Sequence, residues 1–278
     1  MIRLMVIPES VVMARDALNA GVDRLFLDLE RAGKQDRQGT GTWISSQTLE
    51  DVRRYRETFP DAEMIVRTDP WSALKRDDLE QIIAFGPCAI MLPMIRDLAE
   101  VVAMRDAIGG RLPLLPLIET VASAEALAGI AALEGVEEIY VGLNDLHLDR
   151  GDSFMFQALA DGTVERLAGI AFAAGRRFGF GGIARLGHGD LDAELIIAEH
   201  VRLGSTAVML SRKFKDRATG PFDWAGEIGR IRQAEARFGQ RSAAQAEADR
   251  LDLVATVDRI TGNKTPAGNS THHEQGSR

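Results

Sequence analysis

The chain alternates short apolar runs with longer segments in which apolar residues recur every three or four positions. Such short runs predict buried strands, and the longer period predicts amphipathic helices. Ser10 before the first helical segment and Gly21 after it are typical start and stop signals. The expected strands are Leu4–Ile7, Arg24–Glu30, Met64–Arg67, Ala89–Ile95, Leu114–Glu119, Glu138–Gly142, Phe178–Ile183 and Thr206–Leu210.

A helical segment follows every expected strand. Short connections between alternating strands and helices imply parallel strands joined by right-handed crossovers. Eight such units close most simply into a (β/α)8 TIM barrel, an α/β fold. A doubly wound open sheet is the alternative, but no G-x-G-x-x-G follows the first strand to support it. The expected helices are Ser10–Ala20, Ser46–Phe59, Arg76–Phe85, Leu98–Ile108, Ser123–Leu133, a stretch within Phe154–Ala174, Ala193–Leu203 and Trp224–Phe238.

Three regions are expected along the chain. Residues 1–238 form the barrel, and residues 239–262, rich in alanine and charge, form a helical arm. Apolar residues spaced along the arm predict that it packs either on a neighbouring subunit or on its own barrel. Residues 263–278 are polar and contain glycine and proline, so we expect a disordered tail.

Composition excludes several classes of protein. The 278 residues carry 33 Lys and Arg against 41 Asp and Glu, a net charge of −8, which argues against a nucleic-acid-binding protein. The single cysteine, Cys88, excludes an internal disulfide framework. No apolar run approaches the roughly 20 residues of a membrane span, and the apolar start is too short for a signal peptide. We therefore expect a cytoplasmic protein.

Polar residues gather where the expected strands end. Asp28 and Glu30 end the second strand, Arg67 the third and Glu119 the fifth, while Asp145 follows the sixth. Any one acid can simply cap the next helix. Glu119 and Asp145, however, are expected on adjacent strands at the rim where barrel enzymes place catalytic groups, and their repulsion calls for a cation. Two carboxylates with water and substrate oxygens suit Mg²⁺ or Mn²⁺. With Arg67 as a bidentate donor to a carboxylate, this set favours enolate chemistry.

Five motifs in order resemble the HpcH/HpaI aldolase and citrate lyase family of the phosphoenolpyruvate/pyruvate barrel superfamily. The resemblance covers roughly residues 1–214. It implies an enzyme that forms or breaks a C–C bond through a metal-bound enolate of a 2-oxo acid, such as pyruvate or oxaloacetate, or of an acyl-CoA. The motifs are Leu27-Asp28-Leu29-Glu30, Val66-Arg67, Met91-Leu92-Pro93-Met94, Pro116-Leu117-Ile118-Glu119-Thr120 and Gly142-Leu143-Asn144-Asp145-Leu146.

The same resemblance assigns roles to individual residues. It implies that Glu119 and Asp145 bind Mg²⁺ or Mn²⁺ and that Arg67 holds the 2-oxo acid. Asp28 and Glu30 resemble acids near the metal-bound waters. The backbone of Gly142, Leu143 and Asn144 is expected near the substrate carboxylate. The second substrate is expected to be an aldehyde or acyl acceptor, and the protein a homo-oligomer, either a trimer or a hexamer.

The chain departs from the family at the expected acid/base. One branch carries a histidine after the second-strand acid, and Arg31 stands there in this sequence. His147, two residues past Asp145, is the candidate substitute, because strand alternation would place both on one side. Arg31, Lys34 and Arg37 are expected to bind an anionic group of the substrate. A citrate-lyase-β-like acyl-CoA lyase and a non-catalytic barrel that binds an oxo acid remain the alternatives.

Glycines concentrate in the seventh strand and just beyond it, in the segment from Gly179 to Arg185. They permit either close approach of the backbone to a ligand or tight packing. Packing is the favoured interpretation.

Overall fold

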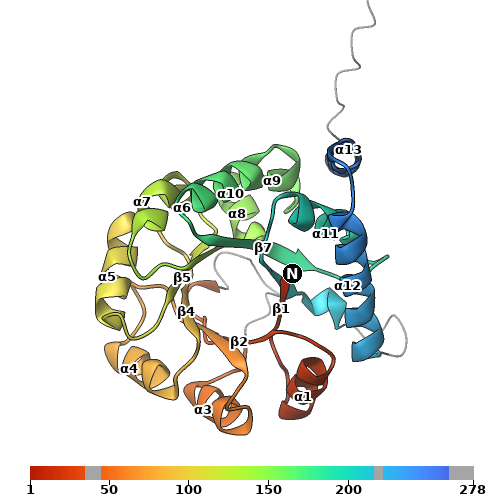
Figure 1. Ribbon diagram of the computed structural model, residues 1–278. Coiled ribbons are helices and arrows are strands. Elements are labelled where there is room, and N and C mark those ends of the chain that lie inside the picture. The colour runs from red at the N-terminus through yellow and green to blue at the C-terminus, as the bar shows by residue number, and fades with distance from the viewer. Residues whose placement is uncertain (35–44, 216–221, 263–278) are drawn as a thin grey trace, which may run out of the picture.

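The protein is a closed barrel of eight parallel strands in sequence order, with β8 paired to β1 (Figure 1). The computed structural model describes residues 1–34, 45–215 and 222–262. The predicted (β/α)8 barrel is confirmed, and every expected strand is present. The strands are β1 (Arg3–Val6), β2 (Arg24–Asp28), β3 (Glu63–Arg67), β4 (Ala89–Leu92), β5 (Leu114–Ile118), β6 (Glu138–Val141), β7 (Arg177–Ile183) and β8 (Ala207–Leu210).

Helices form a ring outside the barrel (Figure 1). The side chain of Ser10 accepts a hydrogen bond from Met13 N and caps the first helix, as predicted. The single helix expected at Ser123–Leu133 is instead two, the first of them capped by Thr120. The helices are α1 (Val11–Asn19), α3 (Leu49–Thr58), α4 (Arg76–Phe85), α5 (Leu98–Ile108), α6 (Val121–Glu125), α7 (Leu127–Ala132), α8 (Leu143–Arg150), α9 (Gln157–Ala160), α10 (Thr163–Ala173), α11 (Ala193–Arg202), α12 (Trp224–Gly239) and α13 (Ala243–Thr261), with a 3-10 turn η1 (Arg212–Phe214).

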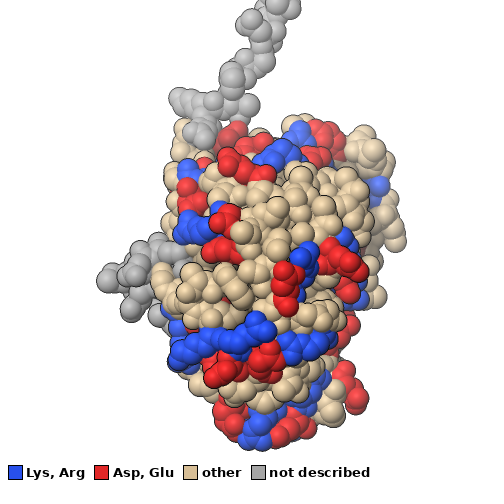
Figure 2. All heavy atoms as spheres, turned by 90° about the vertical axis from the view of Figure 1, so that its left-hand side faces the viewer, with Lys and Arg blue, Asp and Glu red and all other residues tan. Residues whose placement is uncertain are grey.

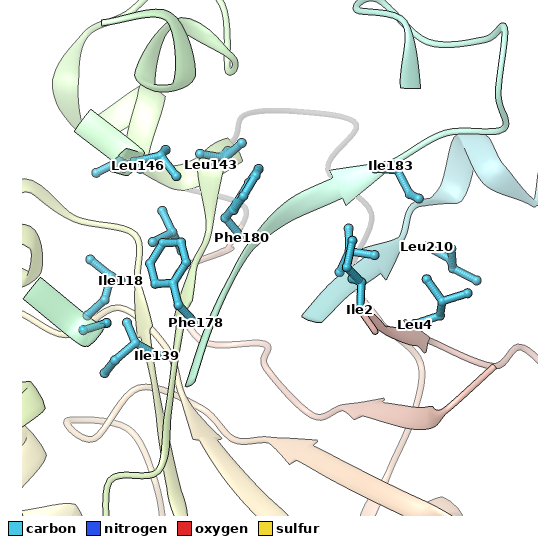
Figure 3. Close-up of a cluster of buried hydrophobic side chains, with 14 of the residues drawn as sticks. Ile2, Leu4, Ile118, Ile139, Leu143, Leu146, Phe178, Phe180, Ile183 and Leu210 are labelled. Carbon is cyan, nitrogen blue, oxygen red and sulfur yellow. The ribbon is translucent and has the colours of Figure 1, made fainter. Parts of the chain in front are cut away.

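The strands are apolar on both faces because each face is covered. Side chains such as Phe26, Met91 and Leu117 fill the barrel interior. Others, including Phe178 and Ile139, pack in the layer between the strands and the surrounding helices (Figure 3). Burial on both faces explains why the sequence shows continuous apolar runs rather than alternation.

Ion pairs close the barrel at the N-terminal ends of its strands. Arg24, only 3% exposed, contacts Glu63 at 2.7 Å and Glu138 at 2.9 Å. On the face drawn in Figure 2, acidic and basic side chains are interspersed rather than segregated. Surface ion pairs such as that between Glu80 and Arg111 join them. The charged side chains at the N-terminal ends of the strands are paired with one another. We therefore expect ligands to bind at the C-terminal ends.

Helix α13 packs on its own barrel. It lies against α9 and α11 and buries Leu253 and Val257. The arm was expected to pack either on a neighbouring subunit or on its own barrel, and in the described structure it packs on its own barrel. The predicted disordered tail, residues 263–278, lies outside the described residues. Among the helices described, none combines the length and apolar character that crossing a membrane requires.

Candidate functional site

A pocket of about 260 Å³ opens at the C-terminal ends of the strands. The predicted residues that line it are Lys34, Arg67, Glu119, Gly142, Leu143, Asn144 and Asp145. Asp28 and Glu30 lie directly behind them, in contact with Arg67 and Lys34. Closure of the barrel thus brings together side chains from four separate strand ends.

Asp28 anchors the two cations of the pocket. Its fully buried carboxylate accepts hydrogen bonds from Arg67 Nε at 2.9 Å and Nη2 at 2.8 Å, and from Lys34 Nζ at 3.1 Å. Burial alone would raise the pKa of Asp28, but the charges and hydrogen bonds of Arg67 and Lys34 outweigh it and lower that pKa. Both cations also lie 3.4 Å from Glu30 Oε2. The planar group of Arg67 is therefore fixed in orientation before any ligand arrives.

Glu119 is the acid that its surroundings stabilise least. It is 2% exposed, and burial together with repulsion from Glu30 and Asp145 raises its pKa to about 8, against a smaller opposing effect of Arg67. Its Oε1 accepts a hydrogen bond of 2.9 Å from the backbone N–H of Met94. Met94 has φ of +52°, a left-handed conformation that is uncommon outside glycine and that aims this N–H. Glu119 therefore requires a proton or a cation at its other oxygen.

The charge and chemistry of this cluster fit a divalent cation. The four acids Asp28, Glu30, Glu119 and Asp145 outnumber the two cations in contact with Asp28 and Glu30, which are Arg67 and Lys34, and Arg212 and Lys215 also line the pocket. Mg²⁺ and Mn²⁺ prefer such oxygen donors, and Mg²⁺ usually keeps several waters. Within the part of the chain that is described, no three His, Cys, Asp or Glu side chains form a ready metal cage. Glu119 and Asp145 would thus supply two ligands, and water or substrate oxygens the others.

Gly142 makes room for Glu119. A Cβ atom at Gly142 would lie 2.7 Å from Glu119 Oε2 and 3.0 Å from its Cβ, closer than real contacts allow. Gly142 is also the N-cap residue of α8, so Asp145 lies in the first helical turn rather than at the cap. The absence of a side chain at position 142 therefore sets the place of the Glu119 carboxylate.

We expect Gly142→Ala to lower the affinity for Mn²⁺ at least tenfold, because the new methyl group displaces Glu119 Oε2 and misplaced ligands weaken metal sites by about that factor. Calorimetric titration with Mn²⁺ measures the effect. Gly169→Ala, on α10 with open space around the added atom, serves as the matched control. Equal Mn²⁺ affinity in the Gly142 variant and the wild type would remove Glu119 from the proposed site.

The structure separates His147 from Asp145. Residues 143–150 form helix α8, not a continuation of the strand, so residues two apart point about 200° away from each other. The alternation assumed for His147 was wrong, and His147 is not among the residues that line the pocket. Arg31 also lies elsewhere: its Nη2 donates to the carbonyl of Gln47 at 2.9 Å. Arg37 lies outside the described residues.

Two contributors were not anticipated from the sequence. The left-handed backbone conformation of Met94 could not be predicted from its residue type, although Met94 belongs to one of the five motifs. Tyr140, inside the barrel on β6, also lines the pocket. The sequence could have indicated this role, because Tyr140 places a hydroxyl group between the apolar residues Ile139 and Val141. A buried tyrosine hydroxyl requires a hydrogen-bond partner.

Comparisons with known proteins agree with this architecture. A sequence model of the HpcH/HpaI aldolase/citrate lyase family matches residues 3–157. An HpcH/HpaI aldolase from Desulfitobacterium hafniense DCB-2 shares the fold at 15% identity and a TM-score of 0.59, over 86% of this chain and 93% of that one. No curated protein sequence matches significantly.

Two solved structures from Mycobacterium tuberculosis also share the fold. The citrate lyase beta subunit, complexed with oxaloacetate and magnesium, is 18% identical with a TM-score of 0.58, over 84% of this chain and 96% of that one. The protein CitE, in complex with magnesium and pyruvate, is 19% identical with a TM-score of 0.59, over 91% of this chain and 96% of that one.

Proposed function

Because the chain belongs to the HpcH/HpaI aldolase/citrate lyase family, we propose that it is a divalent-metal-dependent carbon–carbon lyase or aldolase that acts through the enolate of a 2-oxo acid. The substrate is of the pyruvate or oxaloacetate type. Family membership supports a C–C lyase in general. The bound magnesium, pyruvate and oxaloacetate of the M. tuberculosis structures support the finer assignment.

The observation that carries the proposal is the burial of Glu119 beside two other acids. Its raised pKa and its closeness to Glu30 and Asp145 describe a carboxylate that needs a cation. Arg67 lines the same pocket and can bind an anionic substrate that also contacts the cation. Metal ligands beside an arginine match the needs of a reaction in which negative charge develops on oxygen.

The residues of the chain then divide the work. Glu119 and Asp145 hold the cation, which supplies Lewis-acid stabilisation of the charge on the 2-oxo oxygen. Arg67, held by Asp28 through Nε and Nη2, offers Nη1 to the substrate, since within the described residues Nη1 makes no other hydrogen bond. We assign proton transfer to water beside Glu30 and Lys34, because His147 does not reach the pocket.

The contacts of the β2 loop favour an aldolase over an acyl-CoA lyase. CoA phosphates need unpaired cations, but Arg31 donates to a backbone carbonyl and Lys34 is bound to Asp28 and Glu30. Among the described residues of this loop, Lys34 is therefore already bound to two carboxylates. An aldehyde acceptor, a homo-oligomeric state and the cytoplasm as location remain predictions.

Exchange of deuterium into the methyl group of pyruvate, with Mg²⁺ or Mn²⁺ present, tests enolate formation. We expect the wild-type protein to catalyse exchange and Glu119→Gln to lose at least tenfold, because the amide keeps the shape but cannot supply the negative ligand. Glu125→Gln, at an exposed site on α6, is the matched control. Metal and oxalate binding without any exchange would instead identify a non-catalytic oxo-acid-binding barrel.

A further inference from the structure

The pocket has one half that holds its acids and another half whose described lining residues include no acid. Its acids and their cations come from β2, β3, β5 and β6 and the loops that follow these strands. The other side is formed by Ile7, Gly181, Gly182, Met209 and Leu210, from β7, β8 and the residue after β1. We call these five residues the glycine wall. The residues Ser211, Arg212 and Lys215 that follow β8 also line the pocket. If the 2-oxo acid binds beside the acids, the glycine wall is the surface left for the carbonyl compound that joins or leaves its methyl carbon.

The hydrogen-bond ladder is irregular beneath this wall. Gly179 pairs with Ala207, whereas the next pair is Gly182 with Met209. Three steps along β7 therefore correspond to two along β8, which is a β-bulge. A bulge leaves backbone groups without their regular partners, and buried groups of this kind need others.

Tyr140 from β6 supplies those partners. Its hydroxyl oxygen accepts a hydrogen bond from Met209 N at 2.9 Å and lies 2.5 Å from the carbonyl oxygen of Gly181, to which it donates. The carbonyl oxygen of Phe180 lies 3.1 Å away. Burial raises the pKa of Tyr140, so the hydroxyl keeps its proton. One side chain thus joins β7 to β8 at the bulge, directly under the glycine wall.

The neighbouring glycines fit closely around this arrangement. A Cβ atom at Gly179 would lie 2.8 Å from the Tyr140 ring and 2.7 Å from the carbonyl oxygen of Ala207. Gly181 has φ of +50°, and a Cβ atom there would lie 2.8 Å from Leu143. The close packing favoured for these glycines is thus present, and it is packing around the tyrosine that supports the pocket wall.

We propose that Tyr140 is a positioning residue that sets the shape of the glycine wall, on which the carbonyl partner of the 2-oxo acid binds. The inference rests on the proposed function for the identity of the ligand, and on the geometry alone for the role of Tyr140. The hydroxyl is occupied by backbone groups, so Tyr140 acts through Gly181 and Met209 rather than on the substrate. The wall itself offers apolar surface to the substituent of an aldehyde, and Ser211, Arg212 and Lys215 line the pocket beyond it.

Tyr140→Phe tests the proposal because it keeps the ring and removes the hydroxyl group, with its contacts to Met209, Gly181 and Phe180. We expect kcat/KM for condensation of pyruvate with aldehydes from acetaldehyde to hexanal to fall about tenfold, mainly through the KM of the aldehyde. Exchange of the pyruvate methyl group is expected to fall much less. Hydrogen exchange of the amides of residues 178–183 and 207–211 should accelerate in the variant. Tyr55→Phe, at the chain's other tyrosine, buried on α3 away from the pocket, is the control for the substitution itself.

Each outcome has a separate meaning. Unchanged amide exchange in Tyr140→Phe would overturn the positioning role, whatever the reaction proves to be. Equal losses in condensation and in pyruvate exchange would overturn the link between Tyr140 and the second substrate. A wild-type protein that exchanges pyruvate but accepts none of the aldehydes would overturn the assignment of the glycine wall. Absence of pyruvate exchange in the wild type contradicts only the proposed function.

Discussion

Replacing Arg67 by lysine is expected to lower the rate of pyruvate exchange by about 10²- to 10³-fold, the range typical of losing a donor to a developing oxyanion. Arg67 uses two nitrogens to bind Asp28 and lies with its guanidinium 5.6 Å from the centre of the Phe26 ring. A lysine ammonium carries the same charge but has no planar group with which to bind Asp28 and substrate at once. The loss should therefore fall mainly on kcat.

The experiment compares exchange kinetics and Mn²⁺ affinity in the same variant. Mn²⁺ affinity should stay within a few-fold of wild type, because the ligands Glu119 and Asp145 are unchanged. Arg166→Lys, at an exposed position on α10, controls for the change of side chain. Asp28→Asn should reproduce part of the loss, since it weakens the bond that orients Arg67. Near-normal turnover in Arg67→Lys would refute the role given to the planar group.

The barrel was predictable because its signals are local. Most strands are short apolar runs, and Ser10 caps the first helix as expected. The grouping of Glu119, Asp145 and Arg67 was also predictable, since parallel strands of a barrel end at one rim. Both inferences depend only on where a strand ends.

What failed depended on the conformation beyond the strand end. His147 was misplaced because α8 begins directly after Gly142, and the change from strand to helix redirects every following side chain. Lys34 lines the pocket, and the sequence did not predict that its ammonium group is also bound to Asp28 and Glu30. A cation in a loop shows its charge in the sequence, whereas its partner is decided by folding.

Tyr140 and Met94 show a second limit of the sequence. The hydrogen bonds of Tyr140 compensate a bulge between two other strands, and Met94 acts through a backbone N–H that every residue except proline possesses. Such roles arise only when separate segments come together in the folded protein. The spacing of residues along the chain therefore does not predict them. They are nevertheless the contacts that hold the pocket in shape.

Acidification is expected to destabilise the protein through His200. This side chain on α11 is fully buried, and its ring stacks on Phe180 at 3.7 Å. Nδ1 lies 2.8 Å from the hydroxyl oxygen of Ser205, while Nε2 has no hydrogen-bond partner among the described residues. Burial without a partner for a second proton lowers the pKa of His200 to about 3, from an ordinary value of 6.5. The folded protein therefore keeps this ring neutral.

The sign of the effect follows from the two pKa values. Between pH 6.5 and pH 3 the unfolded chain binds a proton at His200 that the folded chain does not bind. The stabilising contribution is complete above pH 6.5 and is lost as the pH falls, by about 1.4 kcal/mol in the free energy of unfolding per pH unit. At pH 5 the loss should reach about 2 kcal/mol relative to neutral pH.

Urea unfolding between pH 7 and pH 5 measures this contribution as a difference between proteins. His200→Phe keeps the stack on Phe180 and has no proton to bind, so its free energy of unfolding should fall less steeply than that of the wild type. His188→Gln, at an exposed position, should retain the wild-type slope. Since all other titrating groups are shared, parallel curves for the wild type and His200→Phe would mean that His200 binds its proton equally in both states.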